Sequence, residues 1–81
     1  MVDGNLLIFG RRLREIRLAK GLTQEALAEK ASLHPTYIGG IERGERNLGL
    51  SNLLKLSVAL SVSPSSLLSV FDEGIDIDDN E

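Results

Sequence analysis

The chain has 81 residues, which allows one domain with a modest core. It contains no cysteine, which excludes disulfides, iron–sulfur clusters and thiolate zinc sites. The net charge is −3, but six of the twelve acidic residues lie in residues 72–81, so the other six and the nine bases give residues 1–71 a charge of +3.

At the start of the chain, the apolar run at residues 6–9 is too short for a signal peptide or a membrane span, so we expect a soluble, cytoplasmic protein. Apolar residues recur at helical spacing over residues 6–17 and predict a first helix, with Asn5 as its cap. The pair Lys20-Gly21 predicts the end of this helix, because a cation is favoured in the last turn and glycine suits a left-handed exit.

Residues 23–44 predict two short amphipathic helices joined by a brief turn. Thr23 is the expected cap of the first, which covers about residues 24–31, and residues 32–33 form the turn. A turn this short does not let the two helices run antiparallel. Two short helices that meet at a steep angle form a helix-turn-helix, whose second helix is shaped to enter the major groove of DNA.

The second helix of this pair has clear start and stop signals. His34 occupies the cap position, Pro35 suits the first helical position, and Arg43-Gly44 predicts the end. Gly39 and Gly40 lie inside the helix, where each costs up to ~1 kcal/mol relative to alanine. Close approach of the backbone to a ligand or to a neighbouring segment would explain both glycines.

Two further helices follow. The fourth is expected over residues 50–60, capped by Gly49 or Ser51, and the fifth begins at Pro64. The apolar residues of both exceed what one core face needs, which predicts a homodimer through the fifth helix and the end of the fourth. The residues behind this prediction are Leu60, Val62, Leu67, Leu68, Val70 and Phe71. The pattern therefore predicts an all-α, five-helix domain over residues 1–71, followed by an acidic, disordered tail at 72–81.

These elements resemble the lambda-repressor-like helix-turn-helix family, which contains the phage Cro and C1 repressors. The matching residues are Leu13-Arg14-x-x-Arg17-x-x-x-Gly21-Leu22-Thr23-Gln24-x-x-Leu27-Ala28, Tyr37-Ile38-x-x-Ile41-Glu42-Arg43-Gly44, Leu53-Leu54-Lys55-Leu56 and Ala59-Leu60-x-Val62-Ser63. More narrowly, His34-x-Thr36-Tyr37-Ile38 and Ile41-Glu42-Arg43-Gly44-x-Arg46-Asn47-Leu48 look like the controller proteins of restriction–modification systems. Those proteins are stand-alone dimeric regulators of about this length.

The resemblance implies contacts with double-stranded DNA by Gln24, Pro35, Thr36, Tyr37, Gly40, Arg43, Arg46 and Asn47. In the family, the residue at Gln24 binds a phosphate and braces a side chain of the recognition helix. Thr36 and Tyr37 lie in the first turn of that helix, although Tyr37 could equally pack against the preceding helix. Arg46 and Asn47 suit phosphate or minor-groove contacts, and a solvated loop is the alternative.

Pro35 and Gly40 depart from the family pattern, which usually has polar side chains at these positions; controller-like relatives tend to have arginine at Pro35. Proline and glycine offer only apolar contacts to bases, for example with a thymine methyl group. Specificity then depends on Thr36, Arg43, Arg46 and the deformability of the DNA, or the domain has weak DNA specificity or none. Arg17 and Glu42 match a partly buried structural ion pair of the family.

No catalytic arrangement, nucleotide-binding loop or cofactor motif is present, and His34 has no partner ligands for a metal ion. We therefore predict a non-enzyme: a sequence-specific DNA-binding transcriptional regulator that binds a pseudo-palindromic operator as a homodimer. The alternative is an antitoxin or a protein–protein adaptor built on a helix-turn-helix domain, with the acidic segment 72–81 as a candidate partner-binding region.

Overall fold

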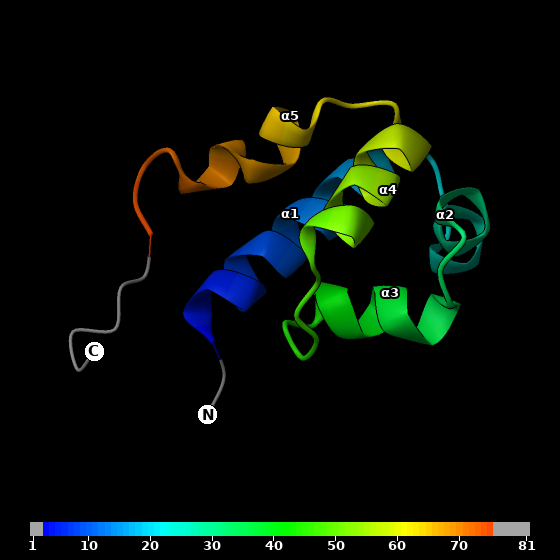
Figure 1. Ribbon diagram of the computed structural model, residues 1–81, viewed down its shortest axis with the longest axis horizontal. Helices are drawn as coiled ribbons and strands as arrows, with labels where there is room; N and C mark the ends of the chain where they lie inside the picture. Colours follow the sequence, from blue (N-terminus) through cyan, green and yellow to red (C-terminus); the bar gives the residue numbers. More distant parts are fainter. Residues whose placement is uncertain (1–2, 76–81) are drawn as a thin grey trace.

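The computed structural model describes residues 3–75 and contains no strand within them (Figure 1). The elements are α1 (Gly4–Ala19), α2 (Gln24–Ala31), α3 (Pro35–Glu42), α4 (Leu50–Leu60), α5 (Pro64–Leu68) and a short 3-10 helix, η1 (Ser69–Phe71). The predicted all-α class and the order of five helices are confirmed. Most of the predicted acidic tail, residues 76–81, lies outside the described residues, as do residues 1–2.

Side chains cap the helix starts largely where the sequence indicates. Thr23 accepts a hydrogen bond from the backbone N–H of Ala26 at 3.0 Å. The imidazole of His34 accepts one from Thr36 N–H at 3.1 Å, with Pro35 at the first position of α3. The expected Asn5 cap is wrong, because Asp3 caps α1 instead. The carboxylate of Asp3 accepts the N–H of Asn5 at 2.8 Å, so the helix begins earlier and Asn5 lies in its first turn.

The connections between helices also follow the sequence. Gly21 and Gly44, the predicted exits of α1 and α3, have φ angles of 73° and 76°, in the left-handed region. Ser32, in the predicted turn between α2 and α3, is left-handed as well, with φ 57°. Figure 1 shows α2 nearly end-on while α3 runs across the view, so the two helices cross steeply and form a helix-turn-helix.

One core joins all five α-helices. Its fully buried large side chains are Leu13, Leu27, Ile38, Ile41, Leu56, Leu60 and Leu67. Leu60 and Leu67, which were expected to belong to an apolar surplus at the dimer interface, instead fill the core, so the prediction is wrong for these two side chains. Leu68 is 41% exposed and remains available to a partner.

The long helix α1 lies between α3 and α5. Figure 1 shows α3 along one edge of the molecule and α5 along the opposite edge.

Among residues 3–75, no single helix is long and apolar enough to cross a membrane. Taken together, α4 with α5 and η1 would have the length and apolar composition of a membrane span, but the two parts are bent by 110°.

Gly10 permits the close approach of α1 to α3. A Cβ atom added at Gly10 would overlap the carbonyl oxygen of Ile41 and lie 2.6 Å from the carbonyl oxygen of Glu42. Both are backbone atoms at the end of α3, so they cannot turn aside as a flexible side chain can. Glycine at this position therefore sets the distance between the two helices.

We predict that Gly10→Ala lowers the free energy of unfolding by about 1–3 kcal/mol, the usual cost of overpacking, although alanine is the better helix former. Urea denaturation followed by circular dichroism measures the change. Val58→Ala is the control, because Val58 is 79% exposed inside α4, so alanine adds helix propensity there without overpacking. Equal stability of the two variants would show that α1 and α3 separate without cost.

Candidate nucleic-acid interface

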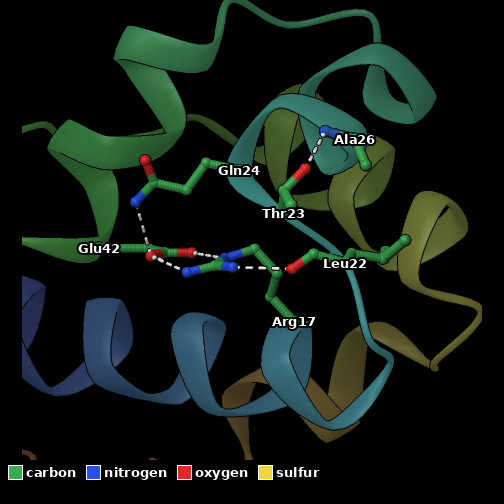
Figure 2. Close-up of polar contacts among 6 residues, drawn as sticks. All are labelled: Arg17, Leu22, Thr23, Gln24, Ala26 and Glu42. Atoms are coloured by element: carbon green, nitrogen blue, oxygen red, sulfur yellow. Dashed lines mark hydrogen bonds and ion pairs between the residues drawn. The ribbon is translucent and has the colours of Figure 1, made fainter.

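A buried ion pair fixes α3 on the rest of the domain (Figure 2). The Nε and second guanidinium nitrogen of Arg17, in α1, donate to the two carboxylate oxygens of Glu42 at 2.6 and 3.0 Å. The remaining guanidinium nitrogen donates to the carbonyl oxygen of Leu22 at 2.8 Å. The two side chains are only 7% and 2% exposed. The pair expected between Arg17 and Glu42 is thus confirmed, with bidentate geometry.

The hydrogen bond to Glu42 raises the pKa of Arg17 above its ordinary value, and desolvation by burial opposes part of this rise. A raised pKa of a cation means that its stabilising effect is fully present below the pKa of the unfolded chain and is lost only as the pH rises through the folded-state pKa. Arginine is already protonated at any physiological pH. The Arg17 charge is therefore a constant part of the fold and does not act as a pH switch.

Gln24, the first residue of α2, joins the same network. Its side-chain nitrogen donates to Glu42 at 3.0 Å, as Figure 2 shows. Its side-chain oxygen lies 3.4 Å from the position that a Cβ at Gly39 would occupy. The expected bracing of the recognition helix by Gln24 is present in this geometry, while its contact with a phosphate stays a prediction.

Pro35 and Thr36 form the first turn of α3, next to the turn of the helix-turn-helix. Pro35 is half-buried and Thr36 is exposed. Backbone N–H groups at the start of a helix carry partial positive charge, which favours an anion such as a phosphate. His34 accepts the N–H of Thr36, so this donor is already satisfied.

Tyr37 is half-buried and its hydroxyl is held by residues outside the helix-turn-helix. It donates to the carbonyl oxygen of Asn47 at 3.0 Å and accepts from the side-chain nitrogen of Asn52, in α4, at 3.1 Å. From the sequence, the Tyr37 side chain could either contact DNA or pack against α2. Its two hydrogen bonds instead connect it to α4 and to the loop before α4. Sequence reasoning missed Asn52, because a polar residue in the first turn of an apolar helix gives no signal of this partner.

Gly40 is buried, and the side chain that covers it is Arg46. A Cβ added at Gly40 would lie 2.5 Å from Cγ of Arg46. The guanidinium carbon of Arg46 also lies 5.3 Å from the centroid of the Tyr37 ring. The sequence offered two reasons for this glycine, close approach of a ligand or of a neighbouring segment. In the structure the close approach is that of a neighbouring side chain, Arg46. The expected contact between Gly40 and a base would require Arg46 to move away.

The loop after α3 brings two cations and an amide to the same edge. Arg43, Arg46 and Asn47 are all exposed. Arg43 pairs with Glu45 at 3.1 Å, and both side chains are more than half exposed, so this pair is strongly screened by water. Sequence reasoning missed Glu45 as a competitor for Arg43. Two residues of opposite charge that lie two positions apart in a loop do not indicate by themselves whether they pair.

The arginines of α1 have different surroundings. Arg12 donates to the carbonyl oxygen of Ser66, in α5, at 3.2 and 3.1 Å and pairs with Glu15 at 2.8 Å. It therefore connects α1 to α5, on the side of α1 away from α3, while Arg11 and Arg14 are exposed. Within residues 3–75, no group of three or more His, Cys, Asp or Glu side chains is arranged to hold a metal ion.

The sequence profile of the helix-turn-helix family matches residues 13–67, which include the ion pair, the turn and the basic loop. This chain belongs to the helix-turn-helix family. Its curated relatives include the control protein C.BamHI of Bacillus amyloliquefaciens, 49% identical over 69 residues, with 84% of this chain and 85% of the relative covered. The control protein C.SmaI of Serratia marcescens is 47% identical over 62 residues, with 76% and 74% covered.

Solved structures of similar helix-turn-helix proteins give the same result. The restriction–modification controller protein C.AhdI from Aeromonas hydrophila is 55% identical, with a TM-score of 0.76, and the match covers 76% of this chain and 94% of that one. The controller protein C.Esp1396I, solved as a tetramer in complex with its natural 35-base-pair operator, is 38% identical, with a TM-score of 0.79 and coverage of 88% and 93%.

We predict that Arg17→Ala lowers the free energy of unfolding by about 3–5 kcal/mol, because it leaves the Glu42 carboxylate buried without its partner. The exposed pair supplies the control, since Arg43→Ala should change stability by about 0–1 kcal/mol. Replacing both members of the buried pair, with Arg17→Met and Glu42→Leu, should recover most of the loss. Urea denaturation of the four proteins tests this, and a small effect of Arg17→Ala would mean that water reaches Glu42.

Proposed function

We propose that this protein is a sequence-specific DNA-binding transcriptional regulator that binds a pseudo-palindromic operator as a homodimer, and that it serves as the controller of a restriction–modification system. The observation that carries the proposal is the position of α3 at a free edge, with its inner face fixed by Glu42 and its first turn and following loop exposed. The similarity to the control proteins C.BamHI and C.SmaI supports the narrower assignment.

In this proposal, the first turn of α3 enters the major groove and the loop after α3 contacts the DNA backbone. Thr36 offers a hydroxyl group to a base edge or a phosphate. Arg46 and Asn47 offer guanidinium and amide donors, and Gln24 contacts the phosphate beside the groove. Contacts of this kind with phosphates would release counterions, so the affinity would depend strongly on salt.

Direct reading of bases by α3 would be limited. Pro35 has no donor, and Gly40 is covered by Arg46. Thr36 and the arginines of the loop are the polar side chains left near the groove. Sequence preference would then come in large part from how easily the operator bends or narrows, since deformation energy depends on the sequence being deformed.

The homodimer would use α5 and the start of α4. Leu50 and Leu68 are 70% and 41% exposed, and with Leu53 and Phe71 they line an apolar groove of about 190 Å³ where α1, α4, α5 and η1 meet. Val58, near the end of α4, is 79% exposed but lies beside Lys30, on another face. The proposed interface therefore consists of α5 and the start of α4, in place of the end of α4 expected from the sequence. A second copy is the expected occupant, because a pseudo-palindromic site needs two copies related by a two-fold axis.

We expect the full chain to protect a defined pseudo-palindromic site in footprinting on the DNA upstream of its own gene. If each protomer neutralises three or four phosphates, the slope of log affinity against log salt should be on the order of −5 to −7 for the dimer. Arg46→Ala should flatten this slope by about 1 per protomer, whereas Lys55→Ala, which removes a charge on α4, should not.

A flat salt response would contradict backbone contacts by the loop after α3. The absence of any protected site would contradict the regulator itself, and capture of a toxin or another protein by the chain would then favour the antitoxin or adaptor alternative.

Sedimentation analysis at micromolar concentration should give a mass near twice 8.8 kDa. Leu68→Asp should shift the protein to a monomer without loss of helix content, since a charged residue would have to be desolvated in the interface while Leu68 contributes little to the core. Val58→Asp introduces the same charge on the other face and should stay dimeric. A monomeric wild-type protein, or equal effects of the two variants, would contradict the proposed interface.

A further inference from the structure

Gly40 lies in the middle of α3, where glycine weakens a helix, so its presence needs a reason in the tertiary structure. A Cβ at this position would lie 2.5 Å from Cγ of Arg46 and 3.6 Å from both Cβ and Cδ. The close atoms belong to the part of Arg46 nearest its own backbone, which cannot move as freely as the guanidinium group. The aliphatic stem of Arg46 therefore packs directly on the backbone of α3, and only glycine leaves room for it.

The ring of Tyr37 provides the second surface for Arg46. The guanidinium carbon is 5.3 Å from the ring centroid, within the range of a cation–π interaction. The ring itself is held in place, because its hydroxyl donates to the carbonyl oxygen of Asn47 and accepts from Asn52. We call Gly40 and Tyr37 together the Arg46 platform.

The charge of Arg46 remains available for a ligand. Arg43 is paired with Glu45, but in the described part of the chain no carboxylate lies within ion-pair distance of Arg46. A free arginine side chain loses much rotamer freedom when it is immobilised by a ligand, and a side chain that is already held loses less. The platform thus lowers the entropy cost of using Arg46 in binding.

We propose that Gly40 and Tyr37 are positioning residues for DNA binding: they hold Arg46 along the recognition helix, and Gly40 acts through Arg46 and makes no contact with DNA of its own. This inference rests on the proposed function, since it assigns Arg46 to operator binding. It also explains how a chain with proline and glycine at two expected reading positions keeps an ordered cation at the groove.

The first test is Gly40→Ala in the full-length protein. Alanine is the better helix former but its Cβ must displace the stem of Arg46, so the two effects oppose each other and the midpoint of urea unfolding should change little. Displacement of Arg46 should nevertheless weaken operator binding roughly tenfold, equivalent to about 1.4 kcal/mol. Val58→Ala is the control, because Val58 is 79% exposed inside α4 and lies away from Arg46, so alanine again adds helix propensity and should leave operator affinity unchanged. Unchanged operator affinity in Gly40→Ala would overturn the proposal.

A double-mutant cycle separates the platform from direct contact between Gly40 and DNA. If Gly40 acts only through Arg46, then Gly40→Ala should change the affinity less than about twofold in a protein that already carries Arg46→Ala, because interacting residues give non-additive effects. If the two losses are additive, Gly40 is needed for something other than Arg46, such as close approach of the DNA, and the proposal is wrong.

Nuclear magnetic resonance gives a readout that does not depend on DNA. In the wild-type protein, the side-chain protons of Arg46 should be shifted by the ring current of Tyr37, and Gly40→Ala should move them toward values for a free arginine. If the wild-type protein binds no operator but shows this shift, the proposed function fails while the platform stands. If the shift is absent in the wild type, or persists unchanged in Gly40→Ala, the platform is overturned whatever the DNA result.

Discussion

The orientation of α3 depends on one buried ion pair, between Arg17 of α1 and Glu42 at the end of α3. Burying two charges costs desolvation energy, so such a pair need not add net stability over an apolar pair of the same size. Its bidentate geometry does restrict the relative position of the two helices, because both guanidinium–carboxylate bonds must form together. Gln24 adds a third bond from α2, so three helices converge on a single carboxylate.

The remaining features of the proposed DNA-binding edge are consistent with this arrangement. The inner side of α3 is fixed by Ile38, Ile41 and Glu42, which are all buried, and its end lies against the backbone of α1 at Gly10. Only its first turn and the loop that follows are left for a ligand. Gly10 and Gly40 have related roles on different sides of α3: the first lets a helix approach it, and the second lets a side chain lie on it.

The apolar residues of α4 and α5 show why a residue count does not locate an interface. Leu67 and Leu68 are adjacent in the sequence and equally apolar, yet the first is fully buried and the second is 41% exposed. A helix turns by about 100° per residue, so neighbours in sequence point in different directions. Which direction faces the core is decided by the packing of α5 on α1 and α4, and the proposed dimer surface is what remains.

Local chemistry was sufficient for the helices themselves. Proline after His34, threonine before Gln24 and glycine after the last turns mark starts and ends through hydrogen bonds and backbone angles within a few residues, so the sequence alone determined the five-helix order and the turn. The pairing of Arg17 with Glu42 was expected from the resemblance to the family and not from local chemistry. The bonds of Tyr37 to Asn47 and Asn52, and the covering of Gly40 by Arg46, join groups whose separation in space no local pattern specifies. These were decided only by tertiary structure, because a contact between two elements depends on the direction and distance at which both are held by the common core.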